Sequence, residues 1–550
     1  MEGRPSATPS RLDLSRRDLL KVGAASALAS AAPLSRPGSG LATEARRGGV
    51  LRVRGWDPPH FDPHLTRNFM TMTTLSFVYS KLLRYKVGAE VPPGAFVVEP
   101  DLAERWEQPD DTTYLFHLRK GVRWHNRPPV NGRELVAEDV TFTFNRFLTI
   151  KGNPERYLLD AVERVEAVDR YTVKFVLNEP YVWLPHKLAS ALCMWVVARE
   201  VVEKYGDLKK SDTAIGTGPF TLERYEPHVK TTFKRNPNYF RGGQPYVEGV
   251  EWMVIDDDST GLAMYRTGQI DAGPSTYWSV RQPDLDVLKK SHPRLSYRDF
   301  LGNMVFAMSL RTDQPPFTDV RVRRAISRAI DRQAIIDGVW IKGEVSGALP
   351  RGLREWSLPV DQLGEGAKYY RYDPQEAKRL LAEAGHAGGF KTQLTVTAGY
   401  GQDVVDAAQL VLRYLKEVGI NAELKLQEYG AYMATTIQGK FDGMTLGPFA
   451  VAWDPDDALY GPYAPEQPRN RSHVTDARLT AMIKEQRRLS DVEARKKVIF
   501  DIQRYLADQQ HYVCLASPMF TGSWQPYVKN HSPNATYDYG SRVAALWLER

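Results

Sequence analysis

The sequence predicts an α/β protein made of several folding units. The chain has 550 residues, of which 42% are hydrophobic and 25% are charged, and these are the proportions of a globular protein rather than of a disordered chain. At roughly 150 residues per domain, this length corresponds to about three or four units. A strand–helix–strand pattern at 394–426 predicts a parallel βαβ unit, whereas alternating apolar and polar residues within 96–212 predict a smaller α+β unit.

The first 42 residues resemble an export signal. Ser15 to Lys21 (SRRDLLK) precedes the apolar, small-residue run Val22 to Ala32, which is too short to cross a bilayer but suits a cleavable signal peptide. Arg16 and Arg17 resemble the arginine pair of a twin-arginine signal. Because no Cys directly follows the run, we expect a periplasmic or otherwise extracytoplasmic protein that is soluble after cleavage and has no lipid anchor. The cleavage position stays open.

One strand and two hairpins are expected in the first half of the mature chain. Residues 48–54 (GGVLRVR) alternate in the manner of a short strand. Residues 112–124 (TTYLFHLRKGVRW) predict two strands joined by a Lys-Gly turn. The alternation at 164–177 predicts a second hairpin, which turns at Asp169 and Arg170.

An amphipathic helix is expected at 319–339 (DVRVRRAISRAIDRQAIIDGV). From Val322 to Ile330 the apolar residues recur at helical spacing, and Thr318 or Asp319 is placed to cap the first turn. The arginines of this segment could suggest a phosphate site, but a solvated basic face explains them better.

A second helix and a βαβ unit follow. In DPQEAKRLLAEAG, Asp373 is placed as the N-cap and Gly385 follows the last turn. A strand at 394–397, a helix at 404–418 and an alternating strand at 420–426 then make a βαβ unit, which requires a parallel strand pair.

Composition and charge exclude several classes of protein. Six of the 73 Lys and Arg residues and three of the 66 Asp and Glu residues lie in 1–42, so the formal charge of +7 falls to +4 for the remainder. That balance, without any long basic run, predicts no nucleic-acid surface. The two cysteines, Cys193 and Cys514, are isolated in the sequence and can form neither a disulfide framework nor a thiolate metal site.

Signatures of catalysis are missing. The sequence contains no GxSxG, HExxH, GxxxxGK[ST] or GxGxxG motif, so we predict no catalytic residues, no enzyme activity, no metal and no cofactor. The nearest approach to a metal cluster is His60, Asp62 and His64 in HFDPH, where Asp-Pro is typical of a turn. An exported hydrolase stays open as an alternative, because sequence spacing cannot show whether two carboxylates converge.

Nine stretches in one order resemble the large extracytoplasmic solute-binding proteins of ABC importers, in the dipeptide, oligopeptide and nickel class known as family 5. They cover nearly all of the mature chain, and together they are far more specific than any single motif. The stretches are FDPHL (61–65), VYSKLLRY (78–85), DLAERWEQPDDTTYLFHLRKGVRWHN (101–126), AEDVTFTFNR (137–146), GTGPF (216–220), RNPNYF (235–240), YRTGQIDA (265–272), DVRVRRAISRAIDRQAII (319–336) and DPQEAKRLLAEAG (373–385).

The resemblance implies a periplasmic-binding-protein-like fold of two α/β lobes, with an extra inserted domain and a ligand cleft between the lobes. It implies the following division of the chain: signal peptide 1–42, first lobe 43–95, 213–305 and 515–550, inserted α+β domain 96–212, and second lobe 306–514. Most of the shared motifs are then scaffold rather than site.

The resemblance also implies where the ligand binds. Contacts come from the chain after the FDP turn, from the strands that cross between the lobes, and from loops of the second lobe. The corresponding residues here are Asn68, Phe69, Met70, Tyr277, Trp278, Gly302, Asn303, Tyr400, Trp453 and Asp454.

One departure from the family pattern bears on the ligand. Peptide-binding members place an aspartate a few residues before an Asp-Pro pair, where it pairs with the α-amine of the ligand. In FAVAWDPDDALY that position falls near Val451, and an ammonium group without a carboxylate partner would be costly to bury. Either Asp454 substitutes, or the ligand lacks a free amine, in which case Trp453 would suit a sugar ring or an apolar body.

The expected function is that of a monomeric receptor. It captures a peptide or peptide-like solute between its lobes and delivers the solute to an ABC permease in the cytoplasmic membrane, while the partner hydrolyses ATP. An oligosaccharide or a metal chelate bound by the same clamp is the alternative ligand, and delivery to a sensor instead of an importer also stays open. The identity of the solute is the main gap.

Overall fold

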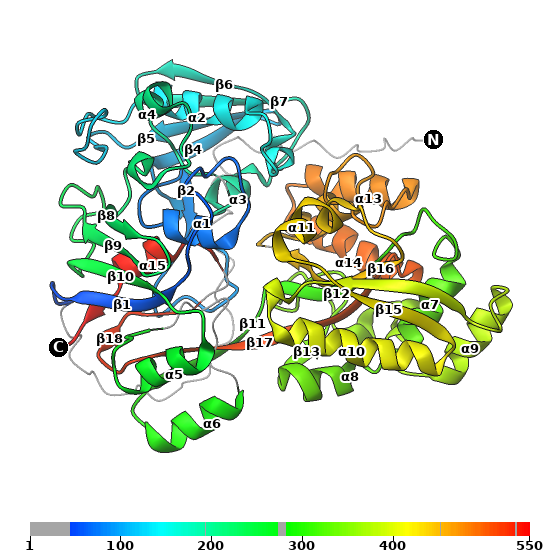
Figure 1. The fold of residues 1–550 in the computed structure, drawn as a ribbon. Coiled ribbons are helices and arrows are strands. Elements are labelled where there is room, and N and C mark those ends of the chain that lie inside the picture. The colour runs from blue at the N-terminus through cyan, green and yellow to red at the C-terminus, as the bar shows by residue number, and fades with distance from the viewer. Residues whose placement is uncertain (1–44, 193, 273–281, 452, 534–535) are drawn as a thin grey trace, which may run out of the picture. The chain divides into compact units, whose positions relative to one another are not determined.

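The computed structural model describes residues 45–192, 194–272, 282–451, 453–533 and 536–550. The expected export signal, together with Tyr277 and Trp278, lies outside the described residues. Arg46–Arg550 forms one unit, and its described strands belong to three larger sheets and two two-stranded sheets (Figure 1).

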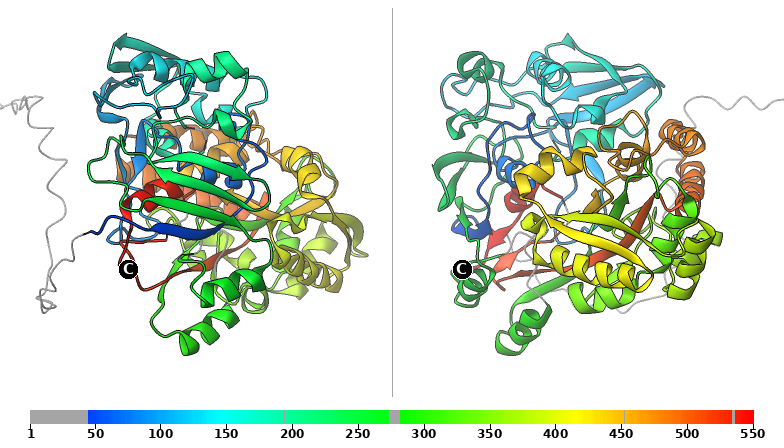
Figure 2. Two further views of the ribbon diagram at one scale, coloured as in Figure 1. Left: turned by 60° about the vertical axis from the view of Figure 1, so that its left-hand side comes forward. Right: turned by 45° about the vertical axis from the view of Figure 1, so that its right-hand side comes forward.

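The first sheet has the strand order β1-β10-β9-β8. Its strands are β1 (Val50–Gly55), β10 (Gly249–Val254), β9 (Lys230–Arg235) and β8 (Phe220–Glu226). The strand predicted at 48–54 is confirmed as β1, which pairs in parallel with β10 and places Val53 opposite Trp252. The Trp252 ring packs at 5.7 Å from Tyr539 of the C-terminal helix α15 (Tyr539–Ala545), which lies against this sheet (Figure 2). The end of the chain therefore shares a core with its beginning.

Short elements surround the first sheet. They are α1 (Phe69–Leu75), β2 (Leu83–Tyr85), β3 (Val98–Pro100), α5 (Asp258–Arg266), α6 (Gln282–Ser291), β18 (Val528–Lys529) and β19 (Trp547–Leu548). Strands β2 and β3 form one two-stranded sheet, and β18 and β19 form the other.

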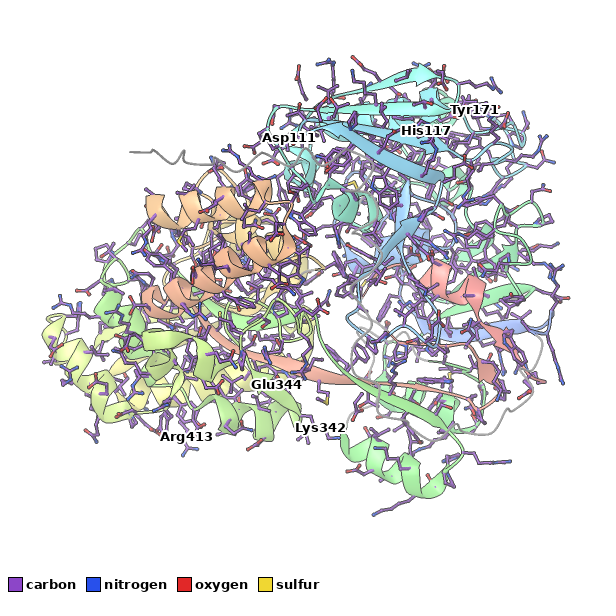
Figure 3. All side chains as sticks on the ribbon, turned by 180° about the vertical axis from the view of Figure 1, so that it is seen from behind. Asp111, His117, Tyr171, Lys342, Glu344 and Arg413 are labelled. Carbon is purple, nitrogen blue, oxygen red and sulfur yellow. The ribbon has the colours of Figure 1, made fainter. Side chains whose placement is uncertain are left out.

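The second sheet lies wholly within 96–212. Its order is β4-β5-β7-β6, with β4 (Ala103–Asp110), β5 (Thr113–Leu118), β7 (Thr172–Leu177) and β6 (Val162–Asp169). Helix α2 (Ala137–Thr149) packs on β6, and His117 and Tyr171 mark the sheet in Figure 3. The hairpin predicted at 164–177 is confirmed, because β6 and β7 are antiparallel.

The hairpin predicted at 112–124 is wrong. Strand β5 exists, but its partners are β4 and β7, and the chain after Gly121 contributes only an isolated bridge between Arg123 and Glu134. Alternation along a segment identifies a strand that is buried on one face. It carries no information about which strand pairs with it.

The third sheet contains the predicted βαβ unit. Its path is β11-β17-β12-β16-β14-β15, and β13 (Gly343–Val345) pairs with β17 beside that path. The path strands are β11 (Ser296–Leu301), β17 (Tyr512–Trp524), β12 (Met304–Leu310), β16 (Met444–Val451), β14 (Phe390–Val396) and β15 (Ile420–Leu426). Strands β14 and β15 are parallel and are joined by α10 (Gln402–Glu417), so the prediction is confirmed.

Both faces of the third sheet are covered. Alternate residues of β12 belong to two different cores, with Met308 and Leu310 in one and Val305 and Ala307 in the other. A sheet that is buried on both faces is the hallmark of an α/β architecture, as the sequence predicts.

The helix predicted from residue 319 begins as expected but ends early. The Asp319 carboxylate caps α7 (Val320–Arg328), and Asp331 then caps a separate short helix, α8 (Arg332–Ile335). The basic face is not fully solvated, since Arg323 is buried and donates to the main-chain oxygens of Phe317 and Gln509. Its role is to satisfy backbone carbonyls rather than to bind phosphate.

The helix predicted at 373–385 is confirmed as α9 (Pro374–Glu383). The Asp373 carboxylate accepts from the main-chain N–H of Glu376, and Pro374 occupies the first turn. Gly385 has φ of 86°, a left-handed conformation that favours glycine after a helix end.

Two antiparallel strand pairings connect the regions on either side of residue 302 (Figure 1). Strand β11 pairs with Met519–Trp524, whereas β12 pairs with the Tyr512–Ala516 part of the same long strand β17. Gly302 and Asn303 lie between β11 and β12, so they mark the point where the chain crosses. The domain boundaries implied by the resemblance stay a prediction.

The remaining helices complete the fold. In the inserted segment these are α3 (Leu184–Ala189) and α4 (Arg199–Tyr205), and in the later part α11 (Tyr429–Ala434), α12 (Pro455–Tyr463), α13 (Ala477–Arg488) and α14 (Val492–Gln509).

Candidate functional site

The three site residues predicted near the start of the chain lie at the N-terminus of α1. The side-chain oxygen of Asn68 accepts from the main-chain N–H of Met70 at 2.8 Å, so Asn68 caps the helix. Phe69 packs edge-to-face on Trp56 with 5.2 Å between ring centres. All three residues are partly exposed, which leaves their side chains accessible to a solute.

Gly302 and Asn303 are buried at the crossing point of the third sheet. The Gly302 N–H donates to the main-chain oxygen of Pro518 at 3.0 Å. A Cβ at residue 302 would lie 2.5 Å from the Phe520 ring, so a larger residue would have to displace that ring. Packing against Phe520 explains this glycine without a ligand.

Tyr400 belongs to an aromatic group in the βαβ region. Its ring packs edge-to-face on Tyr429 at 5.5 Å and on Tyr432 at 5.9 Å. Tyr400 and Tyr429 are partly exposed, whereas Tyr432 is buried. Burial raises the pKa of the Tyr400 phenol, so the hydroxyl stays protonated and can donate a hydrogen bond.

Trp453 is packed within the protein. It is only 3% exposed, and its ring stands edge-to-face on Tyr537 with 5.3 Å between ring centres. It belongs to the same apolar core as the first sheet, although it follows β16 of the third sheet. Trp453 therefore joins the two regions of the fold.

Asp454 is held in a buried ion pair. Its two carboxylate oxygens accept from Nη1 and Nη2 of Arg495 at 2.8 and 2.6 Å, and the Asp454 carboxylate also caps α12. Burial by itself would raise the pKa of Asp454, but the charge and hydrogen bonds of Arg495 outweigh burial and lower it. Both oxygens of the Asp454 carboxylate therefore already accept hydrogen bonds from the protein.

The predicted contacts Tyr277 and Trp278 lie outside the described residues. Of the other eight, Tyr400 and the three residues of α1 present accessible side chains, whereas Gly302, Asn303, Trp453 and Asp454 are buried. Their part in binding a solute stays a prediction.

Sequence reasoning missed a chain of polar contacts that starts at Arg67. The Nε of Arg67 lies 3.3 Å from Oε1 of Glu155, and Glu155 is fully buried. The other oxygen of Glu155 accepts from the Tyr157 hydroxyl at 3.1 Å. The Tyr157 hydroxyl accepts in turn from Nη1 of Arg469 at 2.8 Å. These contacts link the loop before α1, the segment within 96–212 and the segment after α12.

Arg471 lies two residues further along. It is 6% exposed, and its Nη2 donates to the main-chain oxygen of Pro448 at 3.2 Å. Gly447, which precedes Pro448, lies close to the Tyr400 ring: a Cβ built on Gly447 would be 3.6 Å from that ring. Arg67, Glu155, Tyr157, Arg469, Arg471 and Tyr400 are called the arginine cluster below.

A second set of contacts joins 96–212 to the third-sheet region. Lys187 pairs with Asp457 and lies 3.4 Å from Asp456, and Arg487 lies 3.0 Å from Asp160. The Tyr181 hydroxyl donates to Asp456 at 3.0 Å. The inserted segment and the later segment therefore meet through pairs of charged groups of opposite sign, which are buried or half-buried.

The HFDPH motif serves the scaffold. Asp62 accepts from Arg146 at 2.6 and 3.1 Å, and Arg146 also donates to Nδ1 of the buried His64 at 2.7 Å. Two of the shared stretches are thereby tied together. In the described part of the chain, no group of three or more His, Cys, Asp or Glu side chains is placed to hold a metal ion.

GTGPF packs against another of the shared stretches. A Cβ at Gly216 would lie 2.1 Å from the main-chain oxygen of Val78, and one at Gly218 would lie 2.5 Å from it. The two glycines let the backbones touch. Across the described residues, no helix combines the length and the hydropathy needed to cross a membrane.

Comparison with known proteins places these features in a family. The model for bacterial extracellular solute-binding proteins, family 5, matches residues 97–470. The chain is 31% identical over 483 residues to di/tripeptide-binding protein 1 of Pseudomonas aeruginosa, which covers 82% of this chain and 86% of the relative. It is 27% identical over 534 residues to the dipeptide-binding protein of Escherichia coli. This match covers 92% of this chain and 94% of the relative.

A solved structure gives the same result. A periplasmic binding protein of Helicobacter pylori, in complex with the peptide STSA, superposes with a TM-score of 0.79 at 26% identity, covering 92% of this chain and 99% of that one. The two-lobe α/β fold is shared. The chain belongs to the bacterial extracellular solute-binding proteins of family 5.

Proposed function

We propose that this protein captures a small peptide or peptide-like solute between its two lobes and delivers it to an ABC permease. The names of two relatives and the bound peptide of a structural neighbour support this class of ligand. The observation that carries the proposal is the hydrogen bond from Arg469 to Tyr157, because it joins second-lobe and inserted segments beside accessible polar and aromatic side chains.

The clamp works through differential affinity. A solute that touches both lobes stabilises the closed arrangement, whereas the empty protein can open. The partly exposed aromatic side chains of Tyr400 and Tyr429 suit a small solute that is enclosed on most sides. Closure around the solute gives the permease a form to recognise.

The proposal includes three finer points. The protein binds its solute without converting it, as expected for a family of binding proteins. It acts outside the cytoplasmic membrane after export by a twin-arginine signal, and it is released without a lipid anchor. Its solute is imported rather than reported to a sensor.

Calorimetry on the exported protein tests the proposal. A panel of di- and tripeptides should include at least one that binds saturably, and the same peptide should raise the melting temperature, since ligand at a hundred times its Kd adds about 2.7 kcal/mol of stability. The peptide should be recovered intact after incubation. Turnover of the peptide would favour the hydrolase, and binding of an oligosaccharide or a metal chelate alone would replace the proposed ligand class.

A further inference from the structure

We infer that the arginine cluster binds a carboxylate that the solute carries in addition to the C-terminal carboxylate common to all peptides, and hence that the protein selects acidic peptides or peptide-like acids. The inference rests on the proposed function and narrows its substrate class. It stands on three guanidinium groups that meet at the lobe junction with most of their donors unused.

Arg67 supplies the first of these groups. Its side chain is 22% exposed, and its contact within the described part of the chain is the 3.3 Å approach of Nε to Glu155. Its two terminal nitrogens make no hydrogen bond to any described residue. The same Glu155 carboxylate also accepts from Tyr157, so it is shared rather than dedicated to Arg67.

Arg469 supplies the second group. It is 8% exposed, and Nη1 alone among its nitrogens hydrogen-bonds to a described residue, the hydroxyl of Tyr157. That partner is neutral. No carboxylate of the described residues lies within ion-pair distance of Arg469.

Arg471 supplies the third group. It is 6% exposed, and its hydrogen bonds to described residues come from Nη2 alone, at 3.2 and 3.5 Å to two main-chain oxygens. It too lacks an acidic partner in the described part of the chain. The hydroxyl of Tyr400 donates to the weak acceptor Sδ of Met433 at 3.5 Å and can donate to an anion instead.

Other buried arginines of this chain are used differently. Arg495 donates from all three nitrogens, to Asp454 and Gln486. Arg332 likewise donates from all three, to the oxygens of Ser327, Cys514 and their neighbours. Arg487, whose Nε and Nη1 have no hydrogen-bond partner among the described residues, instead lies within ion-pair distance of three carboxylates, those of Asp160, Glu179 and Asp456. Within the described part of the chain, Arg469 and Arg471 have neither a full set of acceptors nor a carboxylate partner.

The charge balance of the cluster points to an anion. It contains three guanidinium groups and one carboxylate, Glu155, so it has an excess of two positive charges. Buried cations without counter-ions are costly, and planar guanidinium groups match a carboxylate with two parallel hydrogen bonds. A peptide without acidic side chains brings one carboxylate to this excess of charge, whereas an acidic peptide brings two. The charge balance therefore favours acidic solutes.

A matched pair of peptides tests the inference. Ala-Glu and Ala-Gln differ by one charge at nearly constant shape, and N-acetyl-Ala-Glu removes the ammonium group as well. Calorimetry at neutral pH should give Ala-Glu at least about tenfold tighter binding than Ala-Gln, and acetylation should leave the affinity of Ala-Glu unchanged or improve it.

Two variants locate the contact. Arg471→Met and Arg67→Met should each weaken Ala-Glu by about thirtyfold or more and should leave Ala-Gln within about threefold. Arg413→Met is the matched control, because Arg413 is 76% exposed on α10 (Figure 3) and should change neither affinity. Melting curves confirm that each variant is folded, and Arg67→Met serves if Arg471→Met does not fold.

The outcomes separate the inference from the proposed function. Tight binding of Ala-Gln or of other neutral peptides, equal to Ala-Glu and unaffected by either variant, would overturn the inference and leave the proposed function standing. Failure of every peptide, acidic and neutral, would overturn both.

Discussion

Arg495 and Asp454 form a bidentate ion pair in the interior, with nitrogen-to-oxygen distances of 2.6 and 2.8 Å. The guanidinium group of Arg495 also stacks over the ring of Trp183 at 3.8 Å, and Trp183 belongs to the segment inserted before the third sheet. One cation thus ties the start of α12, helix α14 and the start of α3 together. This arrangement gives Asp454 a structural role where the start of α3 meets α12 and α14.

Replacing Arg495 should therefore destabilise the protein. Arg495→Met leaves the buried Asp454 carboxylate without a partner, and breaking such a pair typically costs about 3–5 kcal/mol. Urea unfolding followed by circular dichroism would measure the loss. Arg413→Met, on an exposed face of α10, should stay within about 0.5 kcal/mol of the parent. Equal stability of the two variants would contradict the structural role.

Stability should fall as the pH drops below about 6.5. Burial lowers the pKa of His64 and of His531 to about 3 and that of His125 to about 4. In the unfolded chain these residues bind a proton near pH 6.5, so the unfolded state gains protons first and stability is lost between about pH 6.5 and the folded values. At pH 5, each histidine accounts for about 2 kcal/mol.

His531→Phe isolates one of these contributions. The imidazole of His531 has no hydrogen-bond partner among the described residues and packs on Trp524. The variant should lose less stability than the parent between pH 7 and pH 5, by about 2 kcal/mol. His228→Gln changes an imidazole that is 87% exposed and should retain the pH dependence of the parent. A His531→Phe profile parallel to that of the parent would show that folding does not lower the pKa of His531.

Tyr157→Phe tests the contact between the inserted segment and the segment after α12. The variant removes the hydroxyl that donates to Glu155 and accepts from Arg469, which should weaken peptide binding about fivefold, the equivalent of about 1 kcal/mol. The control is Tyr171→Phe, whose hydroxyl lies on the exposed second sheet and donates to Glu134 (Figure 3). If both variants bind peptide as the parent does, the hydroxyl of Tyr157 plays no part in closure.

Trp453→Ala should lower the stability of the protein, and it should do so without a specific loss of solute affinity. The ring is almost fully buried against Tyr537, and deleting a buried Trp typically costs about 3–5 kcal/mol. Trp453→Phe keeps part of the packing and should cost less. Chemical unfolding and peptide titration of both variants would separate the two roles, because normal stability with lost affinity would instead make Trp453 a solute contact.

The parts of the fold that depend on neighbouring residues could be predicted from the sequence. The caps Asp319 and Asp373 and the βαβ unit are of this kind, because period and capping act within a few residues. The pairing of β5 could not be predicted, since its partners lie elsewhere in the chain. The arginine cluster was missed for the same reason: Tyr157 and Arg469 are 312 residues apart, and no local pattern marks either one.

The long strand β17 has a mechanical consequence. Its first part pairs with β12 and its last part with β11, so the regions on either side of residue 302 are coupled by a hydrogen-bonded ribbon rather than by a loose linker. A slip of one residue would turn every side chain of the ribbon to its opposite face, so the register of the strands resists sliding and keeps the two regions in one alignment.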